Sequence, residues 1–133
     1  MKTRPVLTLD DCRKISAAAE AEAKKNNWIV CIAIFDDGGH LLHLARMDGA
    51  SPANARIAQG KGRTAAETRR STAVWEERIK GGRNSMLGMP GVTPVQGGLP
   101  IMVEGICVGG VGVSGVQSHE DEQIAAAGIK LLG

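Results

Sequence analysis

The sequence predicts an α+β fold in which helices pack on an antiparallel β-sheet. Three observations support this class: helical spacing of apolar residues at both ends of the chain, an uninterrupted apolar run at residues 28–35, and a second apolar segment at residues 99–114. Short turns containing Gly join neighbouring strands, so the expected order is α-β-β-α-α-β-β-α. This order differs from a Rossmann βαβ unit. The 133 residues suit one domain over residues 1–133.

The first elements are a helix and a β-hairpin. Thr8 can cap a helix over residues 9–26, and Asp11 occupies the capping-box position three residues later. Residues 28–35 and 40–47 are the expected strands, joined by the tight-turn sequence Asp-Asp-Gly-Gly. Because the first strand is apolar without alternation, both of its faces are expected to be covered.

The central helix carries two glycines that a helix interior does not favour. Ser51 as cap and Pro52 at the first helical position predict its start, and its composition favours helix as far as Arg70. Gly60 and Gly62 each destabilise a helix by about 1 kcal/mol relative to Ala. We therefore expect them to mark close packing against another backbone.

The second half of the chain is expected to hold a short helix over residues 71–79, a loop over residues 84–98 and another hairpin. One further short strand is placed near residues 93–97. Ser118 is expected to cap the final helix. Glycines 109, 110, 112 and 115 of the last strand indicate close approach by a helix, a ligand or another subunit. An open apolar strand would be a sticky edge, so a homo-oligomer is expected.

Composition excludes several functions. The net charge is only +2, from 16 Lys+Arg and 14 Asp+Glu, which argues against a protein that coats nucleic acid. Trp28, Phe35 and Trp75 are the only aromatic residues, too few for a base-stacking surface. No apolar run approaches the roughly 20 residues that cross a bilayer, so neither nucleic acid nor membrane is expected as a partner.

The cysteines favour a reducing compartment. Cys12, Cys31 and Cys107 are odd in number and scattered, which fits neither a disulfide framework nor a zinc site. No apolar segment of a secretory signal follows Lys2 and Arg4. We expect free thiols in a cytoplasmic protein.

Two histidines flank the second strand. His40 and His43 are three residues apart, so on a regular strand they point to opposite faces and cannot both bind one metal without a bulge. No metal site is predicted. His43 lies in an apolar context and is a candidate for acid–base chemistry or axial ligation, with a structural histidine bonded to backbone as the alternative.

Charged residues of the two later helices are the other candidates. Arg56, Arg63 and Arg70 recur every seven residues, which predicts one helical face. That face is either solvated, or Lys61 and Arg63, beside Gly60 and Gly62, form a cationic rim for a small carboxylate or propionate groups. Glu120 belongs to an acidic helix start, which the helix dipole alone can explain, or it acts in a cleft or interface.

Several motifs in order resemble the GlcG/HbpS-like family, often labelled haem-binding or haem-degrading. They lie at residues 61–66, 97–101, 105–115 and 120–122. The resemblance implies a profilin-like fold with a five-stranded antiparallel sheet, assembled as dimers or larger rings or octamers. It also implies haem as a cofactor for some members, which tend to ligate it through a histidine of the first helix. Residues 9–26 contain no histidine.

Two functions follow as expectations. The first is a small-ligand-binding module that takes a tetrapyrrole or another anionic organic molecule in a pocket near the Gly-rich strands. Its expected ligand-binding residues are Cys31, Lys61, Arg63, Gly98, Pro100 and Ser114. The alternative is a cofactor-free lyase or isomerase acting on a hydroxylamino-aromatic acid or a 2-oxo acid. There Arg63 would hold the substrate carboxylate, and His43 or Glu120 would move a proton.

Overall fold

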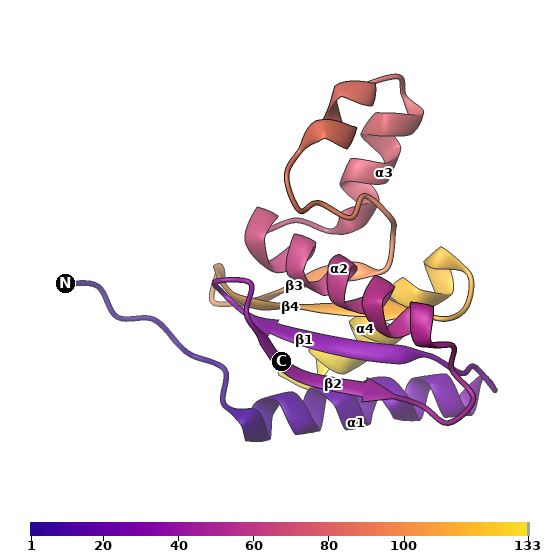
Figure 1. Ribbon diagram of the computed structural model, residues 1–133. Coiled ribbons are helices and arrows are strands. Elements are labelled where there is room, and N and C mark those ends of the chain that lie inside the picture. The colour runs from indigo at the N-terminus through magenta and orange to yellow at the C-terminus, as the bar shows by residue number, and fades with distance from the viewer. Residues whose placement is uncertain (133) are drawn as a thin grey trace.

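The fold is built around a four-stranded antiparallel sheet (Figure 1). The computed structural model describes residues 1–132 of the chain. The strand order of the sheet is β2-β1-β4-β3, so the two hairpins meet along β1 and β4. The elements are α1 (Leu9–Lys25), β1 (Cys31–Asp36), β2 (Leu41–Arg46), α2 (Pro52–Thr68), α3 (Thr72–Lys80), the 3₁₀ helix η1 (Asn84–Gly88), β3 (Gly98–Val103), β4 (Ile106–Ser114) and α4 (Ser118–Lys130). The α+β class and the antiparallel sheet are confirmed.

The expected extra strand at residues 93–97 does not form, so the sheet has four strands and not five. Pro94 has no N–H to contribute to a ladder. The N–H of Thr93 donates instead to Thr64 Oγ1 of α2, at 2.8 Å. Residues 93–97 are therefore hydrogen-bonded to α2 through Thr93 and lie outside the sheet.

Helices cover both faces of the sheet, α1 and α4 on one and α2 on the other (Figure 1). The face toward α1 and α4 carries the larger core. It includes the fully buried side chains Ile15, Ile32, Ile34, Val111 and Ile124. The face toward α2 is built from smaller residues, with Phe35 as its one large side chain. The second helical layer therefore lies close to the sheet backbone.

Glycines in the sheet make this close approach feasible. A Cβ atom at Gly112 would overlap the carbonyl oxygen of Ala58, and one at Gly110 would overlap the carbonyl oxygen of Gly62. A Cβ atom at Gly62 itself would lie 2.9 Å from the N atom of Gly112. Of the three expected neighbours of the glycine-rich strand, the helix is the one that occupies this face.

Local capping chemistry sets most helix ends. Thr8 and Asp11 form the predicted capping box, with N–H to side-chain oxygen distances of 3.1 and 2.9 Å. Ser51 caps α2, but this helix ends at Thr68, before Arg70, because Arg69 adopts a left-handed conformation with φ 61°. The cap of α4 is one residue earlier than predicted.

At the start of α4, Gln117 and not Ser118 is the capping residue. The N–H of Gln117 donates to Glu120 Oε1 at 3.1 Å, so this glutamate is part of the helix cap. The local sequence permits either start, and the observed one also lets Asp121 accept the N–H of Val116 at 3.1 Å.

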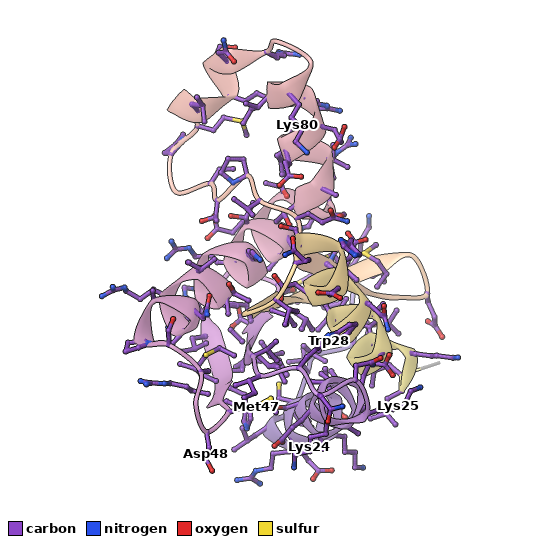
Figure 2. All side chains as sticks on the ribbon, turned by 90° about the vertical axis from the view of Figure 1, so that its right-hand side faces the viewer. Lys24, Lys25, Trp28, Met47, Asp48 and Lys80 are labelled. Carbon is purple, nitrogen blue, oxygen red and sulfur yellow. The ribbon has the colours of Figure 1, made fainter. Side chains whose placement is uncertain are left out.

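Residues 70–97, here called the arm, project from the sheet and carry α3 and η1 (Figure 1). Figure 2 shows the arm from the side, with Lys80 on it and Trp28 and Met47 near the opposite end of the molecule. Trp75 anchors α3, because its Nε1–H donates to Thr68 Oγ1 at 3.2 Å. Glu122 of α4 holds the base of the arm through Ser71 at 3.1 Å and Gln96 at 3.2 Å.

Candidate ligand-binding cleft

An open cleft lies between the β1–β2 hairpin, α2 and the segment of the arm at Thr93. Its cavity volume is about 510 Å³. Apolar, neutral polar and basic side chains all contribute to its surface. It is lined by Phe35, Gly39, His40, Leu41, Arg56, Gln59, Gly60, Arg63 and Thr93.

The hairpin turn supplies one wall. Asp36 Oδ1 accepts the N–H groups of Gly38 and His40, at 2.9 and 3.0 Å, which fixes the turn. Gly39 completes it with φ +80°, a conformation that favours glycine. Phe35 and Leu41 are register partners across the hairpin, so both reach the same side of the sheet. The turn thereby places His40 beside an apolar pair.

Gly60 shapes the opposite wall. A Cβ atom there would overlap Thr93 Oγ1 and would lie 3.1 Å from Thr93 Cβ. Because Gly60 has no side chain, the arm packs directly against α2. There the N–H of Thr93 donates to Thr64 Oγ1 at 2.8 Å. Gly60, which destabilises the helix, thus leaves room for Thr93, thirty-three residues later in the sequence, to line the cleft.

The cleft is cationic. Arg56 and Arg63 lie two helical turns apart on α2, which separates their Cα atoms by about 10 Å. Within residues 1–132, neither guanidinium has a carboxylate oxygen within 4.0 Å. Glu67, which the spacing could have paired with Arg63, forms no ion pair in the same part of the chain. The two arginines are therefore available to an anionic ligand.

Of the six residues predicted to bind a ligand, Arg63 lines the cleft and the other five do not. Cys31 is fully buried beneath α2. Gly98 packs against the backbone of Lys61, and Ser114 donates to Asn54 Oδ1 at 2.9 Å. Pro100 pairs with Gly110 inside the sheet. The expected pocket over the Gly-rich strands is filled by α2.

Lys61 is an internal ion-pair partner. Its Nζ donates to Asp121 Oδ2 and to the carbonyl oxygen of Val113, both at 3.0 Å. Both charged side chains are only 2% exposed. Burial raises the pKa of the Asp121 carboxyl above its ordinary value, against the lowering effects of Lys61 and of the Val116 N–H. Asp121 is an interaction partner that sequence reasoning missed, since it lies sixty residues from Lys61.

The two predicted proton-transfer residues lie outside the cleft. His43 pairs with Ile34 in the sheet, and its Nδ1 is buried without a hydrogen-bond partner among residues 1–132. Glu120 caps α4. The histidine that lines the cleft is His40. Its place directly after the tight turn was the one feature of the sequence that could have indicated a site there. Gln59 and Thr93 had no such signal.

His40 is the one residue lining the cleft that could bind a metal ion through an imidazole, and the other lining residues offer no thiol or carboxylate. Among residues 1–132, no three His, Cys, Asp or Glu side chains form a metal-binding group. In the same residues, no helix is long and apolar enough to cross a membrane. The cleft offers one imidazole and two guanidinium groups as polar contacts, and α1 contains no histidine.

The fold and its cleft define a small α+β domain in which one antiparallel sheet lies between two helical layers. The model of a family described as "Haem degrading protein HbpS-like" matches residues 7–130. The chain belongs to this HbpS-like family, which confirms the resemblance seen in its motifs.

Individual relatives agree with this assignment. Protein GlcG of Escherichia coli strain K12 is 48% identical over 114 residues, covering 86% of this chain and 85% of GlcG. The crystal structure of an HbpS double mutant from Streptomyces reticuli is similar with a TM-score of 0.91 and 32% identity, covering 100% of this chain and 91% of that one. A crystal structure of a PduOC–haem complex has a TM-score of 0.86 and 25% identity, covering 95% and 94%.

Proposed function

We propose that this protein is a small-molecule-binding module whose cleft takes an anionic organic ligand. The observation that carries the proposal is the presence of Arg56 and Arg63, without carboxylate partners in the described chain, in one cavity with Phe35 and Leu41. A guanidinium binds a carboxylate through two parallel hydrogen bonds, and apolar side chains can cover the organic part of the same molecule.

The relatives support a tetrapyrrole as one ligand class. The PduOC relative is described as a haem complex, and the family description refers to haem degradation. In this chain His40 would hold the haem iron, and Arg56 and Arg63 would pair with the propionate groups. Haem would supply its iron chemistry, while the chain's own residues bind and orient it. This assignment moves the ligand site from the Gly-rich strands to the cleft between α2 and the β1–β2 hairpin.

A cofactor-free lyase or isomerase is the second candidate, favoured by one observation. His40 and Arg63 line the same cleft, so a substrate carboxylate held by Arg63 would lie in a cavity that also contains a proton-transfer group. The substrate would be a hydroxylamino-aromatic acid or a 2-oxo acid. His40 takes the role first expected of His43 or Glu120, because those residues do not line the cleft.

Self-association and a cytoplasmic location are further parts of the proposal. Strands β2 and β3 are the two sheet edges, and Leu44 and Met102 on them are 38% and 45% exposed. A partner subunit would cover such edges. Light scattering at micromolar concentration is expected to report a dimer or a larger ring, and a monomer would contradict this part.

The binding proposal is tested by calorimetric titration with benzoate and by absorption spectra with haemin. Arg63→Ala is expected to weaken benzoate binding by about tenfold or more, since hydrogen bonds between charged groups contribute roughly 1.5–3 kcal/mol. Arg70→Ala is the matched control, because Arg70 is exposed but does not line the cleft. Equal affinities of the wild type and the Arg63 variant would overturn the proposal.

For haemin, a Soret shift that is lost in His40→Ala and retained in His43→Ala supports tetrapyrrole binding in the cleft. A shift that survives His40→Ala contradicts this ligand assignment. For the enzyme candidate, turnover of a hydroxylamino-aromatic acid must disappear in His40→Ala while benzoate still binds. Turnover that persists in this variant contradicts the proposed role of His40.

A further inference from the structure

The two arginines of the cleft occupy separate positions along α2. Arg56 lies in the first half of the helix and Arg63 in the second half, with Gln59 and Gly60 between them on the cleft wall. A helix rises about 1.5 Å per residue, so seven residues separate the two Cα atoms by about 10 Å. One carboxylate near either end of this span would leave the other guanidinium without an anionic partner.

Nearby acidic side chains do not neutralise this second charge. Asp36 uses Oδ1 to accept the N–H groups of Gly38 and His40. Asp37 is ion-paired with Arg4, on the N-terminal side of α1. These interactions hold the acids of the hairpin turn in local roles. The Glu67 carboxylate lies against Gly39 at the edge of the cleft, but within residues 1–132 it has no Arg nitrogen within 4.0 Å. Neither arginine of the cleft therefore has an ion-pair partner in this part of the chain.

The space between the two arginines is not charged. Gln59 offers an amide, Thr93 a hydroxyl, and Gly60 no side chain at all, while Phe35 and Leu41 form the facing apolar wall. A molecule that lies along α2 would therefore meet a cation, then a neutral and partly apolar stretch, then a second cation. This order of surfaces is complementary to a ligand that carries an anionic group at each end of an apolar centre.

We propose that the ligand is an organic dianion with an apolar centre, one of whose anionic groups is bound by Arg56 and the other by Arg63. This inference rests on the proposed function, because it specifies the ligand of the same cleft. It adds that Arg56 is a specificity-determining residue, which distinguishes dianions from monoanions.

A matched pair of probes tests it. Terephthalate and benzoate share an aromatic ring and differ by one carboxylate, and both are titrated by calorimetry at constant ionic strength. The wild type is expected to bind terephthalate at least about tenfold more tightly than benzoate. Arg56→Ala and Arg63→Ala should each reduce this preference to about the twofold statistical advantage of two equivalent carboxylates. Arg70→Ala should retain the full preference.

The outcomes separate this inference from the proposed function. If both probes bind equally well and only the Arg63 variant binds them more weakly, the cleft still binds a carboxylate and the dianion inference is overturned. If neither probe binds the wild type, both proposals fail. A preference for terephthalate that survives Arg56→Ala also overturns the inference, because the second carboxylate would then have another partner.

Discussion

Lys61 Nζ lies 3.0 Å from Asp121 Oδ2, and this buried ion pair joins α2 on one face of the sheet to the first turn of α4. Lys61 Nζ also donates to the carbonyl oxygen of Val113, and Asp121 also accepts the N–H of Val116. The pair therefore connects the helix that forms the cleft with the opposite layer of the fold. Lys61 has a structural role, and the cationic character of the cleft comes from the arginines.

Removing one member of this pair should destabilise the protein strongly. Asp121→Ala leaves the Lys61 ammonium buried without its partner, so we expect the free energy of unfolding to fall by about 3–5 kcal/mol. Urea denaturation followed by circular dichroism measures this change. The double variant Lys61→Met/Asp121→Leu is expected to recover a large part of the loss, since an apolar pair carries no unpaired charge. Additive losses in the double variant would contradict a coupled ion pair.

The capping box of α1 should make stability depend on pH. The hydrogen bond from the Thr8 N–H holds the pKa of Asp11 below its ordinary value. Its stabilising contribution is therefore fully present above the pKa of about 4 of the unfolded carboxyl and is lost as the pH falls through the lower folded pKa. Asp11→Ala should lower the melting temperature at pH 7 and have almost no effect near pH 2.

Asp10→Ala is the control for the capping box, because the Asp10 carboxylate contacts the exposed Lys14 side chain and accepts no backbone N–H among residues 1–132. It should lower the melting temperature at pH 7 by less than Asp11→Ala does. A constant effect of Asp11→Ala across the pH range would show that the carboxylate charge does not stabilise the helix.

The close contact between α2 and the sheet predicts a large effect of a single methyl group. A Cβ atom at Gly112 would overlap the carbonyl oxygen of Ala58, and backbone atoms on both sides cannot rotate away. Gly112→Ala is expected to destabilise the protein by at least about 2 kcal/mol in chemical denaturation. Gly88→Ala is the matched control, since a Cβ atom there has no neighbour within 4 Å, and its effect should stay within about 0.5 kcal/mol.

Much of the fold was predictable from local chemistry. The Thr8–Asp11 box, the Ser51–Pro52 helix start and the turn before His40 depend on residues close together in the sequence, and the structure contains all three. The expected fifth strand failed where Thr93 bonds to α2, a long-range contact. The glycines of β4 predicted a close neighbour, but only the packed structure distinguishes a helix from a ligand or a subunit.

The candidate site was less accessible to sequence reasoning. The positive charge of Lys61 is equally consistent with a ligand site and with an internal ion pair, and its partner Asp121 lies sixty residues away. Arg63 is the one predicted ligand-binding residue that lines the cleft. His40 and Thr93 come together with it through the hairpin turn and the arm, which no spacing along the chain reveals.

The most direct test of the central claim is an amide ¹H–¹⁵N spectrum of the labelled protein, titrated with terephthalate. If the cleft binds an anionic ligand, the shift changes should concentrate on the hairpin turn and the cleft side of α2, at Gly39, His40, Gln59, Gly60 and Arg63. The same titration of Arg63→Ala should need a much higher concentration to reach half of its full shift changes. Shift changes confined to β3, β4 or α4, or no changes at all, would contradict the account.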